Sequence, residues 1–423
     1  MQSVSSNMAS GANVKAKTAC GNLKLHQKNG GKMKLVHLVK YHWPDNGGGV
    51  SQSVDMAIHA FEQYRKNKPG YTQEVVCCWQ QNGKPGSKGL LDNGIPVYRC
   101  KSLFTKLSTQ FSAEFLRTVK NRVHEDDIVI YNFPYPLVDL AVLFGLIRGT
   151  LIVWWHCDFN IKGKLANAMF RPLVNHTLKK ANKIIVSSEG NITGSETLRK
   201  YADKCAVIPF AVDQTLIEEG KNYYRSERQA QPSAPVHALF IGRFVWYKGI
   251  DVLLKAYSEL DQSKYELTLV GDGPLFDDMK KLADSLHLAH VNFTGHVSGE
   301  EKKEWIKWCD YLVLPSISKA EAFAIVQIEA MTFGKPVINT NIKSGVPYVS
   351  KDGVTGITVP LQDTEALRDA MKQLGENTEL RERYSKNAID LISGKYSMDM
   401  LDEEYGDLFA ELENQKQISK AKG

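Results

Sequence analysis

Two glutamates eight residues apart, Glu321 and Glu329, have the spacing that says most about chemistry in this sequence. If the residues between them were largely helical, the two carboxylates would lie about 12 Å apart along the axis. That distance does not fit an acid and a base acting on one bond, which need separations of roughly 5–10 Å. Each carboxylate can instead accept hydrogen bonds from two neighbouring hydroxyls. The spacing favours two polyhydroxyl rings bound at either end of a diphosphate, and two unrelated surface acids are the alternative.

Two cations, Arg243 and Lys248, bracket a loop that follows the predicted strand 238–242. Ligands of open α/β sheets bind in crevices at the carboxyl ends of the strands. A planar guanidinium and a compact ammonium both suit the oxygens of a diphosphate. An isolated pair of cations is usually a solvated loop, but the position after a strand favours a ligand site.

The first half of the chain offers two weaker candidates. Three glycines, Gly47 to Gly49, stand between a predicted strand and a helix expected to start near Ser51. Glycine lets a ligand approach the backbone, and a helix N-terminus offers free N–H groups. His156 follows another predicted strand, so we expect it at the carboxyl edge of the first sheet. The alternative for the glycines is a flexible loop, and the alternative for His156 is a structural role in the core.

Short β-rich segments alternate with helical ones from residue 34 onward, and these elements must position the candidates. Many are continuous apolar runs, as expected for strands buried on both faces of a parallel sheet. The expected strands are 35–39, 74–79, 128–131, 151–155, 183–187 and 206–208, then 238–242, 266–270, 291–294, 311–314 and 336–339. The polar segment 213–235 separates the two series. The sequence therefore predicts an α/β protein with two Rossmann-like domains facing each other across a cleft.

The length of 423 residues fits two domains of roughly 200 residues each. We expect an N-terminal domain over 33–212, joined by a terminal helix near 396–414 that crosses back to it. The C-terminal domain would span 213–395. Residues 1–32 are rich in lysine, contain no acid and lack the apolar core of a secretory signal, so a disordered basic leader is expected. No stretch is apolar enough to predict a transmembrane helix.

The formal net charge of +6 is unevenly distributed. Residues 35–210 carry a net charge of about +8 and residues 211–423 about −8. This asymmetry favours an anionic partner such as a membrane surface for the first half, with solvation alone as the alternative. Basic and apolar residues interleave over 162–183, as in helices that lie on anionic membranes, although core packing explains this too. The seven cysteines show no CxxC spacing, which favours reduced thiols in a cytosolic protein over a zinc or disulfide framework.

The stretch from Gly242 to Glu329 resembles the retaining glycosyltransferases of family GT4, which have the GT-B fold. The matching segments read FIGRFVWYKGIDVLLKAY, LTLVGDGP, FTGHVS and SKAEAFAIVQIEAMTFGKPVI, and the first half adds HLVKYHWPDNGGGVSQSV, WWHCDF and IPFAVD. The similarity extends from Met33 to about Leu408. It is greatest to bacterial transferases that build O-antigen or exopolysaccharide.

The resemblance implies a role for each candidate residue. Glu321 would contact the donor hexose and stabilise the charge that develops at its anomeric carbon, and His156 would hydrogen-bond that sugar. Glu329 would bind the ribose hydroxyls. The diphosphate would be bound by Arg243, Lys248, Gly48 and Gly49. The backbone around Phe323 would meet sugar hydroxyls, with Ala322 and Ala324 in place of the glycines common in the family, which makes the pocket tighter.

The resemblance also implies the reaction, a retaining transfer of a hexose that needs neither a metal nor another cofactor. GDP-mannose is the favoured donor, and UDP-glucose or UDP-galactose are the alternatives. The acceptor would be a polyprenyl-diphosphate-linked sugar or an oligosaccharide, bound by a cytoplasmic enzyme peripheral to the membrane, with no nucleic-acid partner. A sugar-nucleotide 2-epimerase and an inactive binding subunit are alternatives of other classes. The spacing of the two glutamates argues against the first, and the retained site residues argue against the second.

Overall fold

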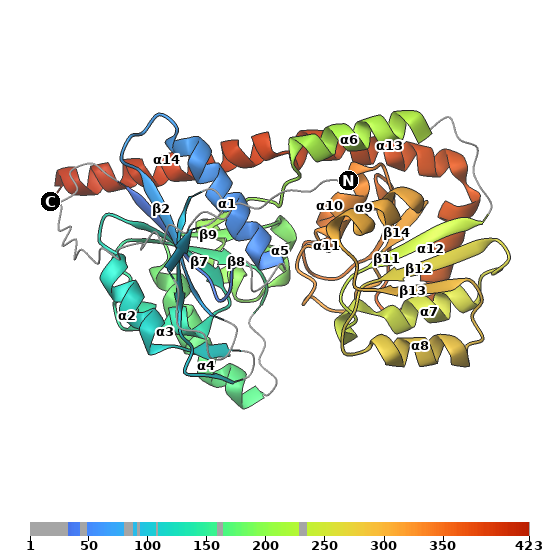
Figure 1. The fold of residues 1–423 in the computed structure, drawn as a ribbon, viewed down its shortest axis with the longest axis horizontal. Coiled ribbons are helices and arrows are strands. Elements are labelled where there is room, and N and C mark those ends of the chain that lie inside the picture. Colours follow the sequence, from blue (N-terminus) through green and yellow to red (C-terminus); the bar gives the residue numbers. More distant parts are fainter. Residues whose placement is uncertain are drawn as a thin grey trace, which may run out of the picture. The chain divides into compact units, whose positions relative to one another are not determined.

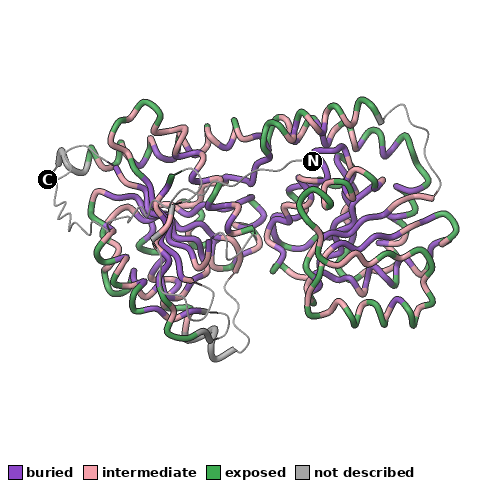
Figure 2. The backbone as a smooth tube through the Cα atoms, viewed as in Figure 1, coloured by how far each residue is buried: buried purple, intermediate pink, exposed green. Residues whose placement is uncertain are grey.

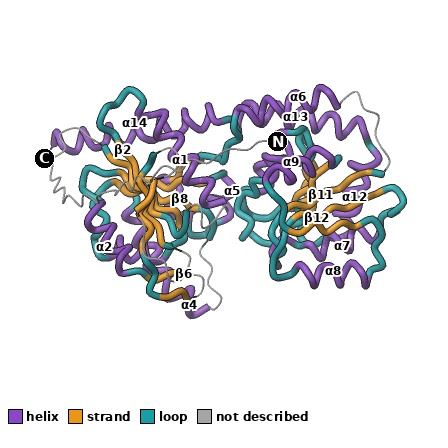
Figure 3. Tube along the Cα trace, viewed as in Figure 1, coloured by secondary structure: helices purple, strands orange, loops and turns teal. Residues whose placement is uncertain are grey.

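The computed structural model describes residues 33–42, 49–79, 88–90, 94–106, 109–158, 164–227 and 235–422. The chain from Met33 onward forms one compact unit. The leader predicted for residues 1–32 lies outside the described residues, as do Gly47 and Gly48. The described strands form two large sheets and one short hairpin (Figure 1 and Figure 3).

The first large sheet contains β1 (Lys34–Leu38), β2 (Thr72–Cys78), β3 (Lys88–Leu90), β4 (Pro96–Cys100), β7 (Ile128–Phe133), β8 (Thr150–Trp155), β9 (Lys183–Val186) and β10 (Cys205–Val207). Their spatial order is β10-β9-β8-β7-β1-β2-β4-β3, and only the β3–β4 pair is antiparallel. The helices of this half are α1 (Gly49–Arg65), α2 (Ala113–Arg122), α3 (Pro136–Leu143), α4 (Lys164–Lys180), α5 (Glu189–Gly194) and the 3-10 helix η1 (Leu198–Lys204). The hairpin joins β5 (Phe104–Lys106) to β6 (Thr109–Phe111).

The second large sheet contains β11 (Val236–Ile241), β12 (Tyr265–Val270), β13 (Val291–Gly295), β14 (Tyr311–Val313), β15 (Val337–Thr340) and β16 (Gly356–Val359). These strands are all parallel, in the order β13-β12-β11-β14-β15-β16. The 3-10 helix η2 (Trp246–Lys248) and helices α7 (Ile250–Ser258), α8 (Phe276–Ser285), α9 (Gly299–Trp308), α10 (Val326–Thr332), α11 (Val346–Val349) and α12 (Thr364–Glu376) connect them.

The apolar strands are buried as their sequences predict. Every residue of β7 is buried, as are five of the six residues of β8 and all of β15 (Figure 2). Helices cover both faces of such a sheet, so polar side chains can reach a ligand only at the strand ends. The two large sheets, one parallel throughout and one parallel except at β3, confirm the predicted fold class together with their helices.

The C-terminal segment returns to the first sheet, as expected. Helix α13 (Thr378–Lys395) is followed by α14 (Met398–Lys422), which packs against α1. The Phe409 ring lies edge-on to Phe61 at 5.3 Å, and Tyr405 lies 6.0 Å from Trp154 of β8. Because these aromatic side chains are buried, α14 completes the hydrophobic core on one face of the first sheet.

The structure refines two sequence-based expectations. The segment predicted as a polar break contains a 14-residue helix, α6 (Gln214–Glu227), which packs on α10 and α13. Its Glu219 pairs with Lys303 and Lys307 of α9, so its charges bind a neighbouring helix. In α4, the apolar residues Val174 and Leu178 lie in the core, so these two side chains are not available to a membrane.

Within the described residues, none of the helices has the length and apolar character needed to span a bilayer.

Candidate functional site

Glu321 and Lys248, which are far apart in the sequence, form a buried ion pair. Lys248 Nζ lies 2.6 Å from Glu321 Oε2, and the two side chains are 9% and 10% exposed. Ser316 Oγ donates to the same carboxylate oxygen at 3.1 Å. The other oxygen, Oε1, accepts no hydrogen bond from the described residues, so it can accept one from a ligand.

The loops that carry this pair fold against each other because of Gly249. Its φ of 64° is left-handed, and a Cβ there would lie 2.2 Å from the Pro315 carbonyl oxygen. The Ile317 N–H then donates to the Tyr247 carbonyl at 2.8 Å. Glycine alone accommodates this approach without strain, so the Lys-Gly dipeptide positions the ammonium beside the glutamate.

Arg243 begins the same loop and is exposed. Burial raises the pKa of the neighbouring Tyr247 phenol to about 12, with Glu321 adding to the rise and Arg243 opposing it. The structure therefore brings Arg243, Lys248 and Glu321 to one place. Arg243 makes no ion pair with the described residues, and its guanidinium remains free to bind an anion.

Glu329 lies on α10 and is also paired. Its Oε1 is 2.6 Å from Lys302 Nζ on α9, in a contact that is only partly exposed. Sequence analysis missed Lys302, which no motif around it marks as functional. Because α10 begins at Val326, the residues from 321 to 325 are not helical and the axial estimate of 12 Å does not apply.

The backbone after Glu321 has an unusual conformation. Ala324 has a φ of 61°, a left-handed value that is uncommon for alanine and natural for glycine. The N–H groups of Ala322, Phe323 and Ala324 donate to no acceptor among the described residues, which leaves them available for a ligand. The Phe323 side chain packs against Phe210 at 5.0 Å, so it belongs to the core.

His156 follows β8 and is oriented by two polar neighbours. Its Nε2 lies 3.0 Å from Asn132 Oδ1 and 3.4 Å from Ser53 Oγ. Since Ser53 donates its own proton to the Val50 carbonyl, Nε2 must carry the imidazole proton. Burial lowers the pKa of His156 to about 3, so the ring is neutral at physiological pH. Nδ1 has no partner among the described residues and can accept a hydrogen bond.

Gly49 is the first residue of α1, two residues earlier than the predicted start. A Cβ on Gly49 would lie 3.3 Å from Ile325 Cδ1, which places Gly49 beside the loop that follows Glu321. The predicted contribution of Gly48 lies outside the described residues.

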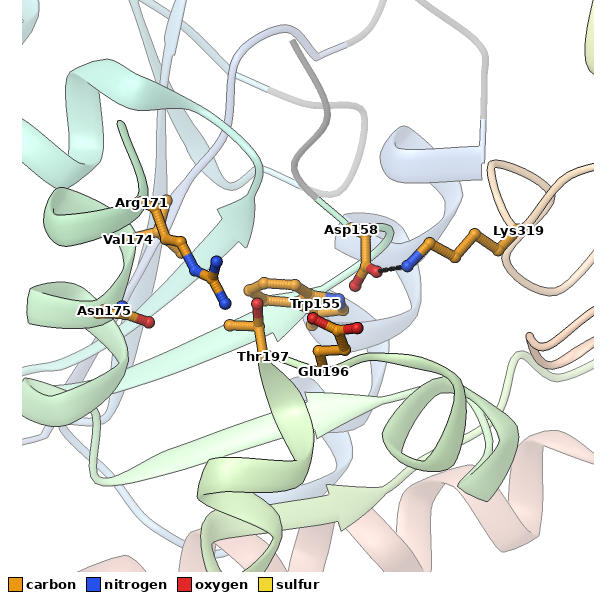
Figure 4. Close-up of a pocket in the computed structure, with 8 residues that line it drawn as sticks. All are labelled: Trp155, Asp158, Arg171, Val174, Asn175, Glu196, Thr197 and Lys319. Carbon is orange, nitrogen blue, oxygen red and sulfur yellow. Dashed lines mark hydrogen bonds and ion pairs between the residues drawn. The ribbon is translucent and has the colours of Figure 1, made fainter. Parts of the chain in front are cut away.

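A cavity of about 220 Å³ lies at the carboxyl end of β8, and we call it the Trp155 pocket. Residues of both halves line it: Trp155, Asp158, Arg171, Val174, Asn175, Glu196, Thr197 and Lys319 (Figure 4). Lys319 Nζ lies 2.5 Å from Asp158 Oδ2. The described residues contain no cluster of three or more side chains suited to a metal ion.

Comparison with known proteins places this site in a family. Residues 225–391 match the family described as glycosyl transferases group 1. The O-antigen chain mannosyltransferase C of Escherichia coli is 30% identical over 383 residues, which cover 90% of this chain and 99% of the relative. The D-rhamnosyltransferase WbpZ of Pseudomonas aeruginosa is 28% identical over 356 residues, covering 84% and 90%.

Solved structures with the same fold are more distant in sequence. Sucrose-phosphate synthase from Thermosynechococcus elongatus is 18% identical with a TM-score of 0.72, covering 91% of this chain and 100% of that one. Anabaena Alr3699/HepE in complex with UDP and glucose is 18% identical with a TM-score of 0.67, covering 89% and 99%. These likenesses establish the fold.

Proposed function

The chain belongs to the group 1 glycosyltransferases and has the GT-B fold, and from this premise we propose that it transfers mannose from GDP-mannose to a sugar acceptor. The product would keep the α configuration and be part of a surface polysaccharide such as O-antigen. The buried Lys248–Glu321 pair beside the free Arg243 carries the proposal. The mannosyltransferase relative favours the GDP donor, and the complex of HepE with UDP and glucose favours a UDP-hexose as the alternative.

Each side chain of the site has a defined task in this reaction. The leaving diphosphate gains negative charge as the sugar departs, and Lys248 and Arg243 stabilise that charge. Glu321 Oε1 accepts a hydrogen bond from the donor hexose and lies where positive charge develops at the anomeric carbon. Glu329 binds the ribose hydroxyls, sharing its carboxylate with Lys302. Donor binding needs no metal in this scheme, because cationic side chains neutralise the diphosphate.

Retention follows if bond formation and cleavage occur on the same face of the sugar. The acceptor oxygen bonds to the anomeric carbon, the bond from that carbon to the diphosphate oxygen breaks, and the acceptor's proton passes to the diphosphate. His156 is neutral and accepts a hydrogen bond at Nδ1, so it positions a sugar hydroxyl and does not supply a proton.

We further propose a polyprenyl-diphosphate-linked acceptor, reached by peripheral contact with the cytoplasmic face of an anionic membrane. The support comes from four exposed apolar side chains, which lie at the start of the β5–β6 hairpin and at the end of α3: Leu103, Phe104, Leu143 and Phe144. Exposed bases accompany them on the same half of the chain: Lys101, Arg117, Lys120 and Arg148. Apolar side chains beside cationic ones are the combination that binds anionic lipid surfaces.

Calorimetric titration with GDP and UDP, each with and without magnesium, tests the donor proposal. We expect GDP to bind more tightly than UDP, at an affinity that magnesium does not change. Lys248→Met should weaken binding at least tenfold, because it removes a charge-assisted contact with the diphosphate. Lys255→Met is the matched control, since Lys255 is an exposed lysine of α7 outside the site. Preference for UDP would move the donor to a UDP-hexose, and binding of neither nucleotide would refute the proposed donor site.

A further inference from the structure

The Trp155 pocket holds a set of polar side chains that bind nothing in the protein. Arg171, Asn175, Glu196 and Thr197 line it, and their side chains make no hydrogen bond or ion pair with the described residues. Figure 4 shows Arg171 and Glu196 near opposite ends of the Trp155 indole. Together they offer hydrogen-bond donors from the guanidinium, amide and hydroxyl groups and acceptors from the carboxylate, amide and hydroxyl groups.

The charges that line this pocket cancel. Asp158 and Lys319 neutralise each other in their ion pair, and Arg171 and Glu196 contribute one charge of each sign. A phosphate would need donors alone and would be repelled by Glu196. A polyprenyl chain would bury four unpaired polar groups, which is costly. Mixed donors and acceptors beside an aromatic side chain instead suit a neutral polyhydroxyl ring, whose hydroxyls each donate and accept.

The size of the pocket fits a single ring. Its volume of about 220 Å³ is below the roughly 300–1,000 Å³ of sites that hold drug-sized ligands. The Trp155 indole is fixed by Phe133, which stacks on it at 4.1 Å with an angle of 8° between the ring planes. Only 2% of Trp155 is exposed, so the indole forms a rigid wall of the pocket and the polar side chains around it provide the contacts to a ligand.

The pocket adjoins the proposed reaction centre. Lys319 stands two residues before Glu321, and Asp158 stands two residues after His156. A second, smaller cavity shares Trp155, Asp158 and Lys319 with the pocket and extends to Ala322. A ring in the Trp155 pocket therefore lies next to the loop that carries Glu321.

We propose that the Trp155 pocket binds the terminal sugar of the acceptor, that this sugar is neutral and unphosphorylated, and that Glu196 and Arg171 determine its specificity. The proposal rests on the proposed transferase function. It follows that a preceding reaction must already have placed a neutral sugar on the lipid carrier, so this enzyme extends a chain and does not begin one.

Saturation-transfer NMR with methyl α-D-mannopyranoside and α-D-mannose 1-phosphate tests this proposal on the full chain. We expect the neutral glycoside to receive saturation and the phosphate to bind at least tenfold more weakly. Glu196→Gln and Thr197→Val should each weaken glycoside binding about tenfold and leave GDP binding unchanged. Glu189→Gln is the matched control, because Glu189 is an exposed acid near Glu196 in the sequence that does not line the pocket.

The possible results separate this proposal from the function on which it rests. Equal glycoside binding by wild type and both pocket variants would overturn it, as would tighter binding of mannose 1-phosphate. Nucleotide binding without any glycoside binding would overturn the pocket assignment alone. Failure to bind both nucleotide and glycoside would overturn the proposed function as well.

Discussion

The Lys248–Glu321 pair allows a quantitative prediction about stability. At 2.6 Å, opposite unit charges attract by about 6 kcal/mol for an effective dielectric constant of about 20. Burial costs each ion several kcal/mol, so the pair as a whole is close to neutral for folding. Removal of one partner leaves the other charge buried and unpaired, and we expect Lys248→Met and Glu321→Leu each to cost about 3–5 kcal/mol.

The double variant Lys248→Met/Glu321→Leu tests this most sharply, because it replaces both buried charges with apolar side chains. We expect it to recover at least half of the loss seen in either single variant. Differential scanning calorimetry should show that the thermal unfolding midpoint of each single variant is lower by roughly 6 °C or more, at about 2 °C for each kcal/mol of lost stability. Lys255→Met removes a surface pair and should cost less than about 0.5 kcal/mol. If the losses in the double variant simply add, the two charges are not coupled and this reasoning fails.

Four further predictions follow from single residues. Burial lowers the pKa of His37 to about 4 from 6.5, so the unfolded state binds more protons between these values. The contribution of His37 to the free energy of unfolding should therefore fall by about 2 kcal/mol from pH 7 to pH 5, in addition to the falls from His42 and His156, whose pKa values burial also lowers. In urea titrations, the decline for His37→Asn should be smaller than that of wild type by about 2 kcal/mol. Ala324→Gly should change the free energy of unfolding by less than about 1 kcal/mol, because relief of the strain at the left-handed φ offsets the lost burial of the methyl group. Ala324→Val should cost about 2 kcal/mol. Equal thermal unfolding midpoints for the two variants would contradict this. Glu329→Gln should weaken GDP and UDP binding alike by about tenfold in calorimetry, since both carry ribose, and a base-selective effect would argue against ribose binding. Phe144→Asp should reduce binding to phosphatidylglycerol vesicles in flotation assays, whereas Ile418→Asp, at a similarly exposed apolar residue of α14, should not. Equal losses would argue against a specific membrane face.

The sequence predicted the fold well because its strands carry an unambiguous signal. Strands such as β7 and β8 are short, continuous apolar runs, and burial on both faces of a parallel sheet requires that pattern. Five strands lack this pattern and were missed: β3, β4, β5, β6 and β16. Helix α6 was missed because its charged surface resembles a linker, and only its contacts with α9 and α10 show why it is helical.

The site was predictable in its residues and not in its geometry. Motif spacing identified Glu321, Lys248 and Arg243, but no local rule indicates that Lys248 pairs with Glu321, 73 positions further along the chain. Lys302 and the Trp155 pocket escaped sequence analysis, because they depend on which helices and loops meet in three dimensions. At Ala324 the sequence pointed to a feature that the structure then accounts for. Related enzymes commonly have glycine at this position, and the left-handed backbone of Ala324 is a conformation that glycine adopts without strain.

The most direct test of the central claim is product analysis with GDP-mannose and methyl α-D-mannopyranoside, comparing wild type with Glu321→Gln. Proton NMR follows the release of GDP and the anomeric configuration of the new linkage. We predict an α-linked disaccharide from wild type and a loss of at least a hundredfold in rate for the variant, with GDP binding retained. A β-linked product, or a variant as active as wild type, would contradict the account.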